Sequence, residues 1–170
     1  MLLYQSARSW ANKIRQGRAI ESRGTRQLET FAVQLGASVF FRPLDPRVSG
    51  VIIKNEDEDP EIFINSDEHQ MRQRFTLAHE IGHLVERMYV AEDADYSFID
   101  RRQTKPGTYD LHEFFADEFA AELLMPAEEF LRVIDEKGYF GASSHFGVSV
   151  PAVKKRKERL EKHPHEDTYQ

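Results

Sequence analysis

The segment that most constrains this chain is R-Q-R-F-T-L-A-H-E-I-G-H-L at residues 72–84, which contains the pattern H-E-x-x-H. Residues four apart on a helix lie on one face, so His79 and His83 can both reach a single metal ion. Glu80 would lie beside that ion without binding it, where a general base for water is needed. Neutral imidazole suits zinc, and two protein nitrogens leave room for a third ligand and a water.

The residues around this pattern indicate that it lies on a helix. Apolar residues recur at helical spacing and give the segment an apolar side: Phe75, Leu77, Ala78, Ile81, Leu84 and Val85. Ser66 or Asp67 is expected to cap a helix over residues 69–88. This context favours a metal site over the alternative, a surface helix with two incidental histidines.

Composition excludes several classes of protein. With 170 residues, 40% of them hydrophobic and 31% charged, the chain is expected to form one globular domain. No apolar run is long enough to span a membrane, and the N-terminal M-L-L-Y turns polar at once, without a signal-peptide pattern. The absence of cysteine excludes thiolate ligands and fits a reducing cytoplasm, the expected location. The net charge of −6 argues against generic nucleic-acid binding.

Hydrophobic periodicity predicts an α+β domain with a small sheet. Three short strands with brief connections indicate antiparallel pairing, at residues 38–41, 51–53 and 61–65. Helices are predicted over residues 6–16, 28–35, 69–88, 111–124, 127–137 and 151–162. Residues 89–109 are polar and are interpreted as a long loop. We expect a single domain over residues 1–170, with a helical extension at 1–24, a helical C-terminal subregion at 139–162 and a flexible tail at 163–170.

The acidic helix over residues 111–124 is the expected source of the third metal ligand. Its candidates are Glu113, Asp117, Glu118 and Glu122. Glu113 and Asp117 are four apart and share a face, so one can bind metal while the other hydrogen-bonds a histidine ligand. We favour Glu113 as the ligand. For Glu118 and Glu122 we expect a solvated helix face.

Longer strings in the sequence resemble those of a known family, the ImmA/IrrE metallo-endopeptidases. The resemblance covers the chain from about residue 25 and is carried by V-S-G at 48–50, I-N at 64–65, R-Q-R-F-T-L-A-H-E-I-G-H at 72–83, E-F-F-A-D-E-F-A-A-E-L-L-M-P at 113–126 and F-G-V-S at 146–149. It implies a zincin-like fold, in which a small, three-stranded, mostly antiparallel sheet packs on a helical bundle that carries the metal site.

The resemblance also implies functional residues. It places the third ligand at Glu113 and a supporting residue at Asp117, in agreement with the spacing. The sequence departs from the family pattern at Phe115, where a second acidic residue is common. By resemblance, His79, His83 and Glu113 hold a zinc ion, with manganese as the alternative.

The activity implied by the resemblance is peptide hydrolysis in the cytoplasm. Proteins of this family cleave a helix-turn-helix repressor and so switch on a mobile-element, toxin–antitoxin or stress regulon. Glu80 would take a proton from the attacking water and return it to the leaving nitrogen. Another donor should stabilise the oxyanion, and the candidates are Tyr109, His112, Tyr96 and His145. The strand at 61–65 is a candidate edge for an extended substrate.

Two other classes of function remain open at this point. A metal-bound sensor or adaptor could bind a repressor without cutting it, although binding alone does not need Glu80. A DNA-binding regulator could use the C-terminal helices, because F-G-V-S-V-P-A-V at 146–153 resembles a helix-turn-helix and K-K-R-K follows at 154–157. A basic run on a terminal helix is usually a solvated face, so we expect a protein substrate, no membrane association and no direct nucleic-acid binding.

Overall fold

The computed structural model describes residues 1–91, 96–101 and 110–165, with the backbone alone for residues 96–101. In chain order its elements are α1 (Leu3–Arg15), α2 (Arg26–Gln34), β1 (Ser38–Arg42), β2 (Val48–Lys54), β3 (Glu61–Asn65), α3 (Gln70–Glu86), the π-helical turn η1 (Arg87–Ala91), β4 (Tyr96–Arg101), α4 (Leu111–Leu124), α5 (Ala127–Phe146) and α6 (Val150–Lys162). Within the described part of the chain, no helix combines the length and the apolar character needed to cross a membrane.

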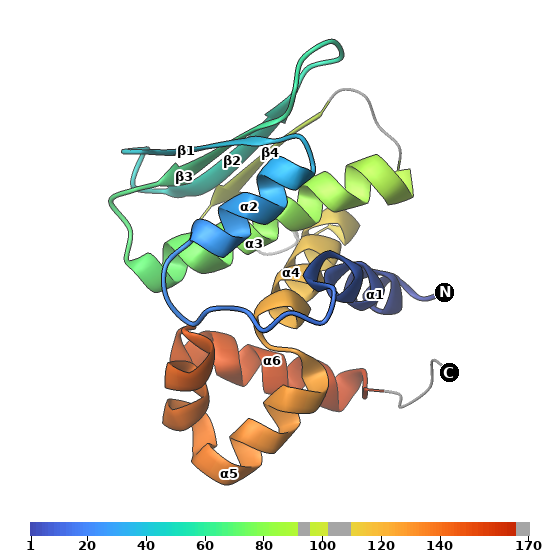
Figure 1. Cartoon of the computed structure of the whole chain (residues 1–170), viewed down its shortest axis with the longest axis vertical. Coiled ribbons are helices and arrows are strands. Elements are labelled where there is room, and N and C mark those ends of the chain that lie inside the picture. Colours follow the sequence, from blue (N-terminus) through green and yellow to red (C-terminus); the bar gives the residue numbers. More distant parts are fainter. Residues whose placement is uncertain (92–95, 102–109, 166–170) are drawn as a thin grey trace.

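The strands form one mixed sheet in the order β1-β3-β2-β4 (Figure 1). β2 is antiparallel to both β3 and β4, whereas β1 and β3 are parallel. The α+β fold and its three predicted strands are confirmed, and the sheet is mostly antiparallel once β4 is counted, but the pairing of β1 with β3 is parallel where antiparallel pairing was expected. β4 adds a fourth strand within the polar stretch 89–109, where we predicted only a loop, and residues 92–95 and 102–109 of that stretch lie outside the described residues.

β3 is not a sheet edge, so the prediction that residues 61–65 offer a free edge to substrate is wrong. The strand lies between β1 and β2 and pairs with both. The physical reason is burial, because Ile62 and Ile64 are completely buried and a central position satisfies the backbone on both sides. The edges of the described sheet are β1 and β4.

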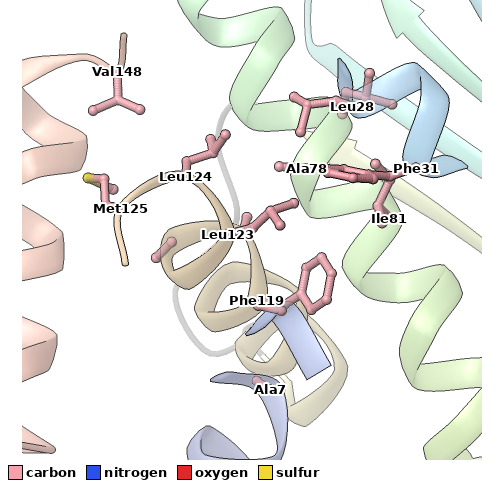
Figure 2. Close-up of a cluster of buried hydrophobic side chains, with 14 of the residues drawn as sticks. Ala7, Leu28, Phe31, Ala78, Ile81, Phe119, Leu123, Leu124, Met125 and Val148 are labelled. Atoms are coloured by element: carbon pink, nitrogen blue, oxygen red, sulfur yellow. The ribbon is translucent and has the colours of Figure 1, made fainter. Parts of the chain in front are cut away.

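Helices lie in layers on one side of this sheet (Figure 1). α2 and α3 cover the sheet, α1 and α4 follow, and α5 and α6 lie farthest from it. Figure 2 shows the apolar cluster between these layers, to which α2, α3 and α4 contribute Leu28, Phe31, Ala78, Ile81, Phe119 and Leu123. α3 is thus enclosed by the sheet, α2 and α4, which explains why both apolar and polar residues along it are buried.

Several helix boundaries differ by a few residues from the predicted ones, and the N-terminal cap of α3 is a different residue. α3 begins at Gln70 and is capped by His69, whose ring accepts the Met71 N–H (3.1 Å), so the predicted caps are wrong. Asp67 lies in the turn before the helix, where its backbone N–H donates to the side chain of Asn65 (3.0 Å). Gly138 has non-helical backbone angles (φ 67°, ψ −170°), so it ends the first helical part of α5 as predicted, and a second helical part continues to Phe146.

Arg74 of α3 ties the helix to two distant segments. Its guanidinium donates to the carbonyls of Glu21 and Gly24, before α2, and to those of Phe146 and Gly147, at the C-terminal end of α5. The bonds to Gly24 and Phe146 measure 2.9 and 3.1 Å, and the side chain is buried. Charge-assisted bonds of this kind are stronger than neutral ones, so Arg74 holds the N-terminal connection and the C-terminal helices on the metal-site helix.

Gly82, inside the H-E-x-x-H pattern, allows α3 and α4 to approach closely. A Cβ there would lie 2.9 Å from the Cα of Ala116 and 3.1 Å from the ring of Phe119. In an open helix a Gly→Ala change stabilises by about 0.5–1 kcal/mol. Here we expect Gly82→Ala to lower the free energy of unfolding by about 1–3 kcal/mol, because overpacking would push the helices apart. Urea denaturation measures this, and a variant more stable than the wild type would contradict the close approach.

Candidate metal centre

Three side chains from two helices converge at one point. His79 and His83 lie one turn apart on α3, and Glu113 lies in the first turn of α4. A carboxylate oxygen of Glu113 is 3.2 Å from Nε2 of His79, and the other is 3.1 Å from Nε2 of His83. One ligand atom from each residue lies within 4.8 Å of the others, a group that can hold a metal ion.

These distances are of the size expected between ligands of one ion. Ligands about 2.0–2.1 Å from zinc at tetrahedral angles are about 3.3 Å apart, and each histidine nitrogen lies 3.1 or 3.2 Å from a different oxygen of Glu113. The two imidazoles are nearly perpendicular, with an interplanar angle of 84°. Two nitrogens and one carboxylate make the donor set of a catalytic zinc site, which keeps a further position for water or substrate.

Asp117 contacts the ring nitrogen of His79 that faces away from Glu113. Its Oδ1 lies 2.8 Å from Nδ1 of His79, so the Nδ1–H can donate to the carboxylate while Nε2 faces Glu113. Such a bond sets the tautomer and the orientation of a metal-binding histidine. The structure therefore brings Asp117 to the place that the sequence predicted, one helical turn after Glu113.

The charges at the site favour a cation. Burial lowers the pKa of His83 to about 4, so the ring is neutral at pH 7 and has a lone pair for a metal. Burial acts to raise the pKa of Glu113, but its bonds to His79 and His83 outweigh this and lower the pKa to about 2. The pKa of Asp117 is also depressed, because its bond to His79 and the nearby cations outweigh the effect of burial. Both carboxyl groups are ionised at neutral pH.

Glu80 is completely buried where α3 passes under β2. A Cβ at Gly50 of β2 would lie 3.0 Å from Oε1 of Glu80 and 2.6 Å from Cγ2 of Thr76. Gly50 thus permits the strand backbone to pass directly over the glutamate that adjoins the first histidine. The sequence contained this glycine in V-S-G, but nothing local indicated its contact with Glu80.

The residues predicted as candidate oxyanion donors lie in different parts of the structure. Nδ1 of His112 lies 2.9 Å from the carboxylate of Glu86, and His112 immediately precedes the candidate ligand Glu113. His145 belongs to α5, and its ring pairs with Glu129 of the same helix at 2.8 Å. Tyr109 lies outside the described residues, and Tyr96 lies on β4, of which only the backbone is described. Among these, His112 adjoins the candidate ligand Glu113 in α4, and its described contact is to Glu86 of α3.

Glu118 and Glu122 are buried, so the prediction of a solvated face is wrong for both. Glu118 accepts from Arg8 (2.7 Å), Arg156 (3.1 Å) and Arg159 (3.0 Å), and Glu122 accepts from Arg156. The signal was present in α4 itself, because charged residues on a helix that is apolar all round must lie in the core with partners. Arg156 is likewise buried, contrary to the solvated basic face predicted for residues 154–157.

The Glu118 cluster should make stability depend on pH. Burial acts to raise the pKa of Glu118, but Arg156 and Arg8 outweigh it and hold the pKa below its usual value. A depressed carboxyl pKa stabilises the fold above the unfolded-state pKa, about 4.3, and this stabilisation is lost as the pH falls through the folded-state value. We expect the free energy of unfolding to decline below about pH 5, and to decline less steeply in Glu118→Gln. Denaturation between pH 3 and pH 7 measures this.

The matched control for this experiment is Glu136→Gln. Glu136 pairs with Arg132 on the surface of α5, and both side chains are more than half exposed. It should leave the pH profile of the wild type unchanged, because exposed pairs contribute little. A Glu118→Gln profile that runs parallel to the wild type would contradict the assignment.

The sequence profile of a peptidase family, M78, described as the IrrE N-terminal-like domain, matches residues 32–158. The chain belongs to this family. Every residue of the H-E-x-x-H pattern, together with Glu113 and Asp117, lies inside the matched range. Membership of the IrrE N-terminal-like family supports a metallopeptidase function, which implies a bound metal ion and a protein substrate. No curated protein matches the chain significantly.

The IrrE N-terminal-like match does not include the whole folded unit. α1 precedes residue 32, and Arg159, near the end of α6, lies just beyond residue 158. Both contact α4 through the buried carboxylate of Glu118. The helix that carries the third metal-site residue is therefore held from both ends of the chain.

Proposed function

We propose that the protein is a zinc-dependent endopeptidase. The observation that carries the proposal is the convergence of His79, His83 and Glu113 on one point, with Glu80 adjoining His79 on the same helix. The donor set suits zinc best, and manganese is the alternative ion. Family membership supports the peptidase class, and the site supplies residues of the types that hydrolysis needs.

The roles of the side chains follow from their positions. When bound, the ion would lower the pKa of a coordinated water and polarise the scissile carbonyl. His79, His83 and Glu113 would hold it, and Asp117 would keep His79 in the tautomer whose Nε2 faces the site. Glu80 would accept a proton from the attacking water and deliver it to the leaving nitrogen.

His112 is proposed to stabilise the oxyanion. Glu86, which is buried, contacts Nδ1 of His112 at 2.9 Å and orients the ring, and a ring protonated on both nitrogens would donate from Nε2 to the oxyanion. His112→Gln should lower kcat by about tenfold or more and leave the metal content unchanged, because His112 is not a ligand. Metal analysis and cleavage kinetics on the same sample measure both quantities. An unchanged kcat would remove His112 from the reaction.

The proposed substrate is a helix-turn-helix transcriptional repressor, and its cleavage would switch on a mobile-element, toxin–antitoxin or stress regulon. This follows from the resemblance to ImmA/IrrE endopeptidases. The test is incubation of the full chain with the repressor encoded nearest to it, with zinc, with manganese and with a chelator. We expect fragments with metal and none with the chelator, and mass spectrometry would locate the scissile bond.

The same experiment separates the proposal from its rivals. A stable complex without fragments would support an adaptor and overturn the endopeptidase. DNA binding through α6 is disfavoured because Arg156 is buried and because Lys155, although exposed, is paired with Asp117. Salt-sensitive retention of the protein on DNA would count for that rival.

A further inference from the structure

Asp117 has contacts on both of its oxygens. Oδ1 faces Nδ1 of His79 at 2.8 Å, as described above. Oδ2 accepts from the ammonium of Lys155 at 3.4 Å and from the guanidinium of Arg159 at 3.3 Å. Both cations come from α6, the last helix of the chain. The carboxylate therefore lies between a proposed metal ligand and two cations that are distant in sequence.

Arg159 is fixed by more than this one contact. Its other terminal nitrogen donates to Oε2 of Glu118 at 3.0 Å, and its guanidinium lies over the ring of Phe114 at 5.2 Å. The side chain is only 12% exposed. Two carboxylates on one helix thus receive the planar fork of a single arginine, a geometry that a flexible surface cation does not maintain.

The burial of the partners makes these contacts effective. Asp117 has a side chain that is 16% exposed, and Glu118 is fully buried. Glu118 is also bonded by Arg8 of α1 and Arg156 of α6, so it is a fixed anchor for Arg159. An aspartate that is bonded on both oxygens has little freedom to rotate, and its position sets the orientation of the imidazole that it contacts.

We propose that Lys155 and Arg159 are positioning residues of the metal centre, which act on His79 through Asp117. The inference rests on the proposed function, because it assigns α6 a part in the same site. It makes the C-terminal helix a component of the centre instead of a solvated appendage. Arg159 is the main residue of the pair, because Lys155 is 59% exposed and its attraction is screened by water.

Electrostatic repulsion between these cations and the metal ion would change the metal affinity in the opposite direction. Two cations near a metal site repel a metal ion, so their removal could tighten binding. This repulsion is weakened because each cation is paired with Asp117, and Arg159 also with Glu118, so that the fields largely cancel. Loss of an oriented partner of a histidine ligand typically costs about 10–100-fold in metal affinity. A residue one contact farther out should have a smaller effect of the same sign.

The experiment is a zinc titration of the full chain against a chromophoric chelator. We expect Arg159→Gln to weaken zinc binding about three- to tenfold and Lys155→Gln about twofold. Arg159→Lys should recover part of the loss, because it restores the charge but not the fork. Lys155→Gln keeps the test decisive if Arg159→Gln is poorly folded, since Lys155 is largely exposed.

Lys157→Gln is the matched control. It removes one cation from the same helix, where Lys157 pairs at the surface with Glu161 at 3.4 Å and lies over the ring of Tyr139. Zinc affinity should be that of the wild type. If Lys157→Gln weakens binding as much as Lys155→Gln, the effect is one of total charge and the proposal fails.

A double-substitution cycle tests whether the effect passes through Asp117. In the Asp117→Asn background, Arg159→Gln should change zinc affinity less than twofold, because the route to His79 is already broken. An additive loss, unchanged affinity in Lys155→Gln and Arg159→Gln, or tighter binding in either would overturn the proposal.

Zinc affinity can be measured without a substrate, so the failure of this inference can be told apart from the failure of the proposed function. A wild type that binds zinc without cutting would overturn the peptidase proposal alone. A wild type that binds no zinc would overturn both.

Discussion

Glu80→Gln should abolish cleavage and leave the metal in place. Glutamine has nearly the same shape as glutamate but cannot accept the proton of the attacking water, and general-base catalysis contributes about 10²–10⁴-fold. His79, His83 and Glu113, the three proposed ligands, are untouched. Fragment formation from the repressor, followed by mass spectrometry, measures the rate. Metal analysis of the same protein shows whether the ion is retained.

The matched control for this variant is Glu61→Gln. Glu61 begins β3 and is exposed, and the same loss of one carboxylate there should leave the rate unchanged. A Glu80→Gln protein that cuts at the native rate would show that Glu80 is not the base. A variant that loses both activity and metal would instead show that Glu80 helps to hold the ion.

Arg74→Met should be the most destabilising single substitution considered for this chain. Methionine fills a similar volume but donates no hydrogen bonds, so the carbonyls of Glu21, Gly24, Phe146 and Gly147 lose a charged donor. Carbonyls left unbonded in a buried place are costly, and we expect the free energy of unfolding to fall by about 3–4 kcal/mol. Chemical denaturation monitored by circular dichroism measures the loss.

Arg132→Met is the control for that change. Arg132 lies on α5 with its side chain 59% exposed, and it pairs only weakly with Glu136. The expected change in stability is within about 0.5 kcal/mol. If Arg74→Met were no more destabilising than Arg132→Met, the connection before α2 and the turn after α5 would not depend on Arg74.

The centre of the site could be predicted because its geometry is local. A spacing of four on a helix places His79 beside His83, and the same spacing places Glu113 one turn before Asp117. Only the meeting of two helices had to be assumed, and the close packing at Gly82 is what brings them together.

The features that sequence reasoning missed depend on residues far apart in the chain. The central position of β3 is set by β1 and β2 on its two sides, which strand patterns alone do not reveal. In the sequence, Glu118 cannot be told from a surface glutamate, because its partners are distant along the chain. Arg8 is 110 residues before it and Arg159 is 41 residues after it. Local propensity cannot encode such contacts, because they form only when the helices pack.

The most direct test of the central claim is anomalous scattering at the zinc edge from crystals grown with zinc. We predict one peak per chain, about 2.0–2.2 Å from Nε2 of His79, Nε2 of His83 and a carboxylate oxygen of Glu113. Glu80 should lie beside the peak without binding it. A peak at other residues, a peak that omits Glu113, or no peak at all would contradict the proposed metal centre.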